Sequence, residues 1–171
     1  MIRIICVGKI KEKYLLDLIN DYQTRINKYH KLEIVELIDS NKNEEGDRIL
    51  TKLKDKSFKV ALTLDGKKYT SLELSKFIDK TLMNYGNIDF IIGASSGIAD
   101  KVLEKVDYKI SFSDLTFPHG LFRGSLLEQI YRSFNIPFSG LIRFTDSAQR
   151  FKPSLTFSDN LREYTTRRLY R

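Results

Sequence analysis

The sequence predicts an α/β fold in which a mainly parallel sheet is covered by helices on both faces. Segments with strand character alternate with segments of helical periodicity along most of the chain. The strand segments are apolar almost throughout, which is typical of parallel strands that are buried on both faces. With 171 residues, of which 42% are hydrophobic, the chain has enough apolar material for a single core. We therefore expect one compact domain.

Three strands are predicted in the first part of the chain. Residues 2–7 are predicted as a buried strand with an apolar run at 4–7, and Gly8 and Lys9 end it with a turn signal. In residues 11–29 apolar side chains recur at three- and four-residue steps, which predicts a helix with one apolar face. Residues 32–38 suit a second strand, and a short helix follows it. Residues 58–64 form the third strand, which Asp65 and Gly66 end.

The same alternation continues up to residue 136. Thr70 and Ser71 can cap the next helix, residues 88–92 form a fourth strand, and residues 93–97 are a glycine-containing turn. A short helix around Val102 leads to a possible fifth strand at residues 108–112. Residues 119–135 again have helical periodicity. We predict a domain at residues 1–136 and a basic, aromatic C-terminal extension at residues 137–171, where this periodicity is lost.

Net charge favours a polyanionic partner. The formal charge is +7 with a pI near 9.4, although charge alone does not separate RNA from DNA or a membrane surface. Residues 137–171 carry +4 of this, from seven Lys and Arg against three Asp and Glu. Cys6 lies in an apolar run and is interpreted as a buried strand residue. The sequence contains neither a signal peptide nor an apolar run that could span a membrane, so we expect a cytoplasmic protein with no membrane partner.

Three loops are candidate ligand contacts, because parallel sheets bind ligands beyond the carboxyl ends of their strands. They are residues 65–67, 93–97 and 111–119. The glycine turn at 93–97 has neither the lysine of a phosphate-binding loop nor the three glycines of a dinucleotide fingerprint. Cys6, His30 and His119 are too few and too dispersed for a zinc site, so no metal is expected. Nothing in the spacing supports a hydrolase triad.

Four separated motifs resemble those of a known family. They are Val-Gly-Lys-Ile-Lys-Glu-Lys-Tyr at 7–14, Phe-Ser-Asp-Leu-Thr-Phe-Pro-His at 112–119, Gly-Leu-Phe-Arg at 120–123 and Leu-Glu-Gln-Ile-Tyr-Arg at 127–132. From about residue 1 to 136 the chain resembles the ribosomal large-subunit RNA pseudouridine N3-methyltransferases of the SPOUT class. The resemblance implies an α/β fold with a C-terminal trefoil knot, a homodimer, S-adenosylmethionine as cofactor, and N3 of a pseudouridine in 23S ribosomal RNA of the assembled ribosome as target.

The resemblance also implies a set of site residues. Matching by motif, the cofactor-binding positions are Leu62, Gly93, Phe112, Ser113, Asp114, Leu115, Thr116 and Phe117. A slip of register would put Leu64 in place of Leu62. Adenine can sit among apolar side chains while its edge pairs with main-chain groups, and glycine at position 93 is expected to leave room for the cofactor.

His119 and Arg132 are the candidate catalytic residues. His119 either begins a helix after Pro118 in a purely structural role, or faces the RNA and handles a proton. Arg123 and Arg132 either contact phosphate or are solvated surface residues. The resemblance favours Arg132, because the family's Tyr-Arg pair is near its substrate site.

The C-terminal part departs from the family pattern. Family members usually end soon after the Tyr-Arg helix, with a Tyr-His followed by a basic residue, but this chain has no histidine after His119. Residues 137–171 are therefore a lineage-specific RNA-binding extension, the product of a frameshift or another artefact, or a mark of lost catalysis. Three hypotheses of function follow: an active methyltransferase, a catalytically silent ribosome-binding protein, and an enzyme or nucleotide-binding domain that uses a different cofactor.

Overall fold

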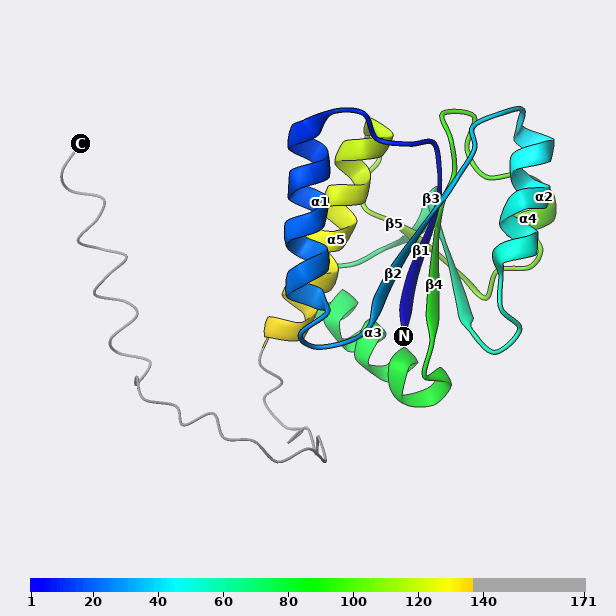
Figure 1. Ribbon diagram of the computed structural model, residues 1–171. Coiled ribbons are helices and arrows are strands. Elements are labelled where there is room, and N and C mark those ends of the chain that lie inside the picture. The colour runs from blue at the N-terminus through cyan, green and yellow to red at the C-terminus, as the bar shows by residue number, and fades with distance from the viewer. Residues whose placement is uncertain (137–171) are drawn as a thin grey trace, which may run out of the picture. The chain divides into compact units, whose positions relative to one another are not determined.

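Residues 1–136, the part of the chain that the computed structural model describes, form a five-stranded sheet between two layers of helices (Figure 1). The strands are β1 (Ile2–Val7), β2 (Leu32–Leu37), β3 (Phe58–Lys68), β4 (Ile88–Ile92) and β5 (Tyr108–Ser111). The helices are α1 (Lys13–Ile26), α2 (Lys42–Lys52), α3 (Ser71–Tyr85), α4 (Asp100–Leu103) and α5 (His119–Asn135). The predicted α/β class is confirmed, and the predicted extension at 137–171 lies outside the described residues.

All strand pairs in the sheet are parallel, in the order β2-β1-β4-β3-β5. The apolar runs of β1 and β4 are buried along their whole length, as their composition predicts. Arg3 and Asp89 are in register on these two strands and form a buried ion pair, in which Arg3 Nε lies 2.8 Å from Asp89 Oδ1. Arg3 also donates to the carbonyl of Lys52 at 3.0 Å, so this pair fixes the amino edge of the sheet.

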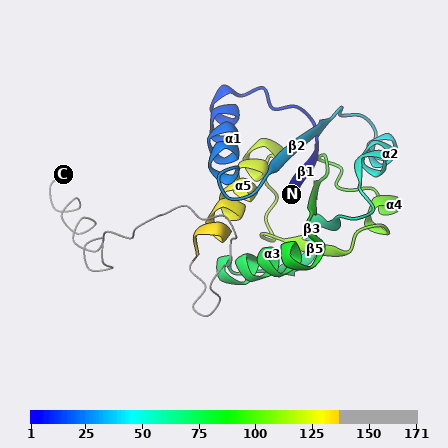
Figure 2. The same cartoon turned by 60° about the horizontal axis from the view of Figure 1, so that its bottom comes forward.

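Two layers of helices cover the sheet. The larger core lies under α1, α3 and α5 and includes Ile19, Ile78 and Leu126, whereas the smaller one lies under α2 and α4 and includes Ile49 and Val102. Figures 1 and 2 show the two groups of helices on opposite faces of the sheet. Within residues 1–136 no helix is long and apolar enough to cross a membrane.

Helices α1 and α5 pack closely because α5 carries two glycines. A Cβ atom on Gly120 would lie 2.6 Å from Leu15 Cδ1, and one on Gly124 would lie 2.8 Å from Leu18 Cδ2. The predicted single apolar face of α1 is correct only in part. Leu15 and Ile19 are buried, but Tyr14 is 71% exposed and Leu18 is 36% exposed. Part of the apolar face of α1 therefore lies on the surface of the described chain.

Strand β3 is longer than predicted. It pairs with β5 through Leu62 and Ile110, loops out, and pairs again through Lys67 and the same Ile110. A Cβ atom on Gly66 would lie 2.4 Å from the carbonyl carbon of Ile110, so only glycine lets the two backbones approach this closely. The prediction that Gly66 ends the strand is wrong for this reason. Gly66 closes a bulge, and residues 63–66 project beyond the ladder.

The predicted start of helix α3 is confirmed by its cap. Thr70 Oγ1 accepts a hydrogen bond from the backbone of Glu73 at 3.3 Å, and the Glu73 carboxylate accepts one from the backbone of Thr70 at 2.8 Å. This reciprocal arrangement satisfies two backbone donors that the first turn of a helix leaves free. Gly86 ends the helix with a φ of +71°, a conformation that glycine adopts without strain.

Candidate active site

A cleft of about 760 Å³ lies beyond the carboxyl ends of the strands. Three segments form most of its wall: the β3 bulge, the turn after β4, and the loop between β5 and α5. These segments are far apart in the sequence, but parallel strands deliver their carboxyl ends to one edge of the sheet. The three loops that the sequence singles out therefore contribute to one place, although of residues 65–67 only Asp65 lines the cleft.

The β3 bulge brings apolar and acidic groups to the cleft. Leu62, Thr63, Leu64 and Asp65 all line it, so the two alternative positions, Leu62 and Leu64, both contribute. Leu62 is buried, whereas Leu64 is 55% exposed. The carboxylate of Asp65 lies 3.4 Å from the ammonium group of Lys109, which places a paired acidic group at the cleft wall.

Gly93 lines the cleft and opens the turn after β4. A Cβ atom on Gly93 would lie 2.6 Å from the carbonyl carbon and oxygen of Gly97, and 2.9 Å from a side-chain atom of Ile98. The absent side chain therefore makes room for the turn backbone, and the expectation that it also leaves room for the cofactor stays a prediction. Gly97 donates its N–H to the carbonyl of Ala94 at 2.9 Å and has a φ of +79°, which closes the turn tightly.

The loop between β5 and α5 supplies most of the predicted cofactor residues. Phe112, Ser113, Leu115, Thr116 and Phe117 line the cleft. Ser113 shapes the loop, because its Oγ accepts a hydrogen bond from the backbone N–H of Leu115 at 3.0 Å. The rings of Phe112 and Phe117 both pack on Phe122 of α5, with centroids 5.2 and 6.1 Å from its own. These contacts hold the loop against the first turns of the helix.

Asp114 is the member of this predicted set that does not line the cleft. Its side chain is 80% exposed and forms an ion pair with Lys68 at the end of β3. The prediction that Asp114 binds the cofactor is not supported by its place in the structure.

The two candidate catalytic residues lie at opposite ends of α5. His119 is the first residue of the helix and lines the cleft. Arg132 is thirteen residues further on, a separation of about 20 Å along a helix. Arg132 donates to Glu128 at 2.9 Å and is not among the residues that line the cleft of its own chain. The described chain therefore brings His119, but not Arg132, to the predicted cofactor loops.

Arg123 has neither of the surface roles proposed for it. Its side chain is only 2% exposed, so it is neither a solvated residue nor open to phosphate. The guanidinium group forms an ion pair with Glu36 of β2 and donates to the carbonyl of Gly8 at 3.0 Å. Arg123 therefore ties α5 to the carboxyl ends of β1 and β2.

The cleft also has charged lining residues that sequence reasoning missed. Lys42 in the first turn of α2 and Asp100 at the start of α4 both line it. The only available signal for either was its place at the start of a helix that follows a strand. Cys6 is buried in β1, where burial raises the pKa of its thiol to about 11, as expected for a structural residue. In residues 1–136 no three His, Cys, Asp or Glu side chains lie together as a metal site would require.

A doubly covered parallel sheet with a loop-built cleft at its carboxyl edge defines a cofactor- or nucleotide-binding α/β protein. Comparison with known proteins narrows this class. A family model described as a predicted SPOUT methyltransferase matches residues 1–139. This chain belongs to the SPOUT methyltransferase family, and that membership implies the predicted C-terminal trefoil knot.

Relatives and a solved structure agree with this membership. The chain is 46% identical to a ribosomal RNA large subunit methyltransferase H of Clostridium acetobutylicum, over 149 residues that cover 79% of this chain and 94% of the relative. A protein of the same name from Clostridium beijerinckii is 49% identical with the same coverage. A probable methylase family protein of Haemophilus influenzae has the same fold, with a TM-score of 0.51 at 12% identity, over 97% of this chain and 77% of that one.

Proposed function

We propose that this chain is an enzyme that transfers a methyl group from S-adenosylmethionine to N3 of a pseudouridine in 23S ribosomal RNA of the assembled ribosome, in the cytoplasm. The names of the relatives, ribosomal RNA large subunit methyltransferases, support the reaction class and the RNA. The observation that carries the proposal is the convergence of Leu62, Gly93 and five residues of the 112–117 loop on one cleft. These are positions at which the family motifs predict cofactor contacts.

The cleft suits S-adenosylmethionine in size and chemistry. A volume of about 760 Å³ lies within the range of small-molecule sites, which is roughly 300–1,000 Å³. Leu62, Ile98 and Phe117 offer an apolar surface for adenine, while Asp100 offers a carboxylate to the positively charged part of the ligand. When bound, the cofactor supplies a methyl group that its sulfonium already activates.

The residues of this chain would align the two reactants and handle the proton that leaves the uracil-ring nitrogen. Among the predicted residues that line the cleft, His119 is the one whose side-chain type exchanges protons near neutral pH. The aromatic packing of the 112–117 loop on Phe122 would keep His119 at a fixed place beside the cofactor. We assign His119 the role of contacting the target base or its proton.

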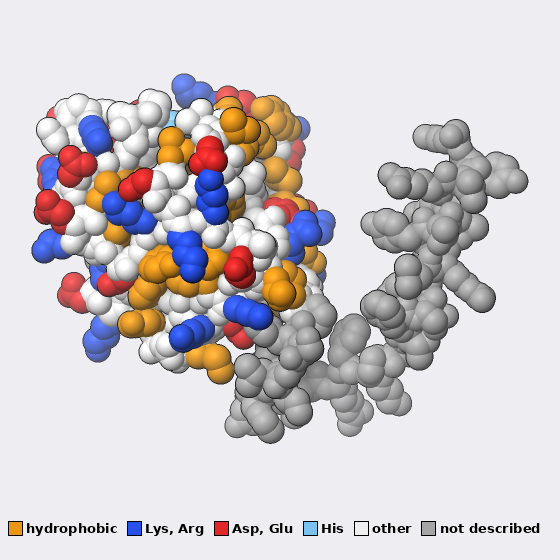
Figure 3. Space-filling view, turned by 180° about the vertical axis from the view of Figure 1, so that it is seen from behind, with side chains coloured by type: hydrophobic (Ala, Val, Ile, Leu, Met, Phe, Trp, Pro, Cys, Tyr) orange, Lys and Arg blue, Asp and Glu red, His pale blue; other side chains and the backbone are white. Residues whose placement is uncertain are grey.

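A homodimer is part of this proposal, and α1 and α5 supply its surface. Tyr14, Leu18 and Leu121 are 71%, 36% and 45% exposed, and Leu18 and Leu121 line a groove of about 420 Å³. Figure 3 shows apolar side chains gathered at the upper right, on the side where α1 and α5 lie. Glu128, the partner of Arg132, lines this groove. Arg132 would therefore serve a site shared between two copies.

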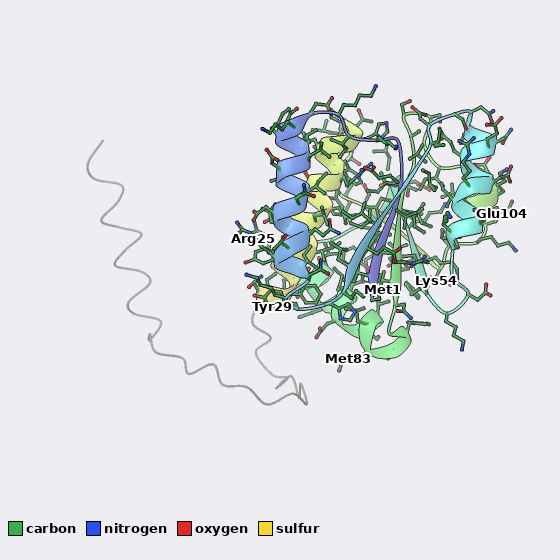
Figure 4. All side chains as sticks on the ribbon, viewed as in Figure 1. Met1, Arg25, Tyr29, Lys54, Met83 and Glu104 are labelled. Carbon is green, nitrogen blue, oxygen red and sulfur yellow. The ribbon has the colours of Figure 1, made fainter. Side chains whose placement is uncertain are left out.

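The dimer surface is tested by Leu121→Glu, with Met83→Glu on α3 as the matched control, because Met83 is 74% exposed and far from α1 (Figure 4). Light scattering is expected to give a dimer mass for the intact protein and the control, and a monomer mass for Leu121→Glu. A dimer mass for Leu121→Glu would place the interface elsewhere.

The function is tested by two measurements on the full chain. Calorimetry with S-adenosylmethionine is expected to show saturable binding, and radiolabelled methyl groups should enter ribosomes that lack the modification. His119→Asn should keep cofactor affinity within about twofold, because the change keeps polarity and approximate size, but should lower transfer by at least a factor of about 100.

Other results separate the alternatives. Cofactor binding without any transfer by the intact protein would favour a catalytically silent ribosome-binding protein. Binding of a nucleotide in place of S-adenosylmethionine would favour a different cofactor.

A further inference from the structure

The β1–α1 loop and the first residue of α1 carry positive charge beside the cleft. Lys9, Lys11 and Lys13 occur within five residues, and all three are exposed. Among residues 1–136, no ion pair involves any of the three. Glu12 is the only acidic residue between them, so residues 9–13 have a local surplus of two positive charges.

The loop is anchored where it leaves the sheet. The backbone N–H of Gly8 donates to the carbonyl of Leu37 at 2.9 Å, and the carbonyl of Gly8 accepts from the buried Arg123 at 3.0 Å. Further along, the side chain of Ile10 lies next to Gly120 of α5, within 3.6 Å of the position a Cβ atom would take. Gly120 follows His119, which lines the cleft. The lysines on either side of Ile10 therefore lie beside the end of α5 that faces the cofactor site.

Three cations on the other side of the cleft are neutralised. Lys68 pairs with Asp114, Lys109 with Asp65, and Lys101 with Asp47 at 2.6 Å. Lys42, which lines the cleft on the α2 side, also has no ion pair among the described residues. On the β1–α1 side three such lysines lie together, next to His119. Figure 1 shows this loop and the start of α5 along the same edge of the molecule.

We propose that Lys9, Lys11 and Lys13 form a docking surface for the phosphate backbone of the ribosomal RNA that flanks the target nucleotide. The inference rests on the proposed function and extends it to the surface that holds the substrate. Exposed lysines attract phosphates without reading sequence, and they release counterions when they bind. The anchored loop sets the distance between the bound backbone and the cleft, so that the base beside these phosphates reaches His119.

A matched pair of variants tests this surface. The triple change Lys9→Gln, Lys11→Gln, Lys13→Gln removes the three charges at the carboxyl edge. The control, Lys31→Gln, Lys54→Gln, Lys56→Gln, removes three exposed lysines that also have no ion pair among the described residues. They flank the amino ends of the strands, since the carbonyl of Lys31 accepts from Ile2 of β1 and that of Lys54 accepts from Ser57, before β3 (Lys54 is labelled in Figure 4). Affinity for ribosomes that lack the modification is measured against salt concentration, with S-adenosylmethionine calorimetry and thermal unfolding as checks.

The expected result is a change in the salt dependence. Each lost contact to single-stranded RNA phosphate lowers the log-log slope by about 0.7, so the triple variant should lose roughly 2 from its slope. Between 50 and 200 mM salt the intact protein should then lose about 16-fold more affinity than the variant. Cofactor affinity and unfolding temperature should stay unchanged, and the control should keep the slope of the intact protein.

An unchanged slope, or an equal loss in the control, would overturn the inference. A loss of affinity with an unchanged slope would overturn it in favour of a ribosomal-protein contact. These outcomes are separate from the fate of the proposed function. If the intact protein transfers methyl groups and the triple variant keeps the salt slope of the intact protein, the proposed function stands and the proposed surface is wrong. If the triple variant changes the salt slope but the intact protein transfers no methyl groups, the surface stands and the chain is a ribosome-binding protein without this activity.

Discussion

The pair formed by Arg123 and Glu36 is buried on one side only, and this asymmetry makes a quantitative prediction. The side chain of Arg123 is 2% exposed, whereas that of Glu36 is 33% exposed. Arg123 also keeps one buried nitrogen, Nε, without a hydrogen-bond partner among the described residues. Removal of either partner therefore leaves a different unpaired charge behind.

The two single changes should differ in their effect on stability. Arg123→Met leaves a carboxylate that water can reach, and methionine fills much of the space of the arginine. The free energy of unfolding should therefore fall by about 1 kcal/mol. Glu36→Ala leaves a guanidinium group inside the protein without its charge partner. The free energy of unfolding should therefore fall by about 3 kcal/mol, the lower end of the range for broken buried pairs. The expected difference between the two is about 2 kcal/mol.

Urea unfolding of both variants and of the double variant measures this difference. The double variant should resemble Arg123→Met, because the buried charge is gone in both. Arg132→Met and Glu128→Ala serve as controls from a pair on α5 whose arginine is 53% exposed, and each should have a smaller effect than Glu36→Ala because neither leaves a buried guanidinium group unpaired. If Arg123→Met destabilises the protein as much as Glu36→Ala or more, the reasoning from one-sided burial is refuted.

Three further predictions concern the core and the cleft. Gly93→Ala places a Cβ atom 2.6 Å from the backbone of Gly97, so the turn must shift and the dissociation constant of S-adenosylmethionine should rise at least roughly tenfold. Calorimetry measures this, with Ser96→Ala as an unaffected control. Because burial raises the pKa of Cys6 to about 11, a thiol reagent at pH 8 should label it only at the rate of unfolding, and rapid labelling of the folded protein would contradict this. Burial holds the pKa of His30 below its ordinary value of 6.5, so the unfolded chain binds the proton first. Stability should fall as the pH drops below that value, and the His30→Gln variant should lack this part of the pH dependence.

Much of the fold could be predicted because buried strands and helix faces have a recognisable apolar pattern in the sequence. The apolar runs at β1 and β4 fit only strands covered on both faces, and they have the predicted bounds. The bounds of α5 were also predicted, since Pro118 and a regular apolar period define them. The three candidate loops follow from the parallel order of the strands, because their carboxyl ends must meet at one edge.

Features that depend on distant partners could not be predicted. The bulge at Gly66 is set by the backbone of Ile110, and nothing near Gly66 in the sequence specifies that neighbour. Arg123 was interpreted as a surface residue because arginine is rarely buried, and its partner Glu36 is 87 positions away. The exposure of part of the apolar face of α1 could not be predicted for the same reason. A helical period does not say whether the chain itself or a second copy covers the apolar side.

The central claim is that the three loops at the carboxyl edge of the sheet together bind S-adenosylmethionine, and amide chemical shifts during a titration test it most directly. The account predicts saturable shifts concentrated in residues 62–66, 93–97 and 112–119, with little change at the groove residues Ser125 and Gln129. Shifts that saturate in the α1 and α5 groove while the three loops stay unchanged, or no saturable shifts at all, would contradict it.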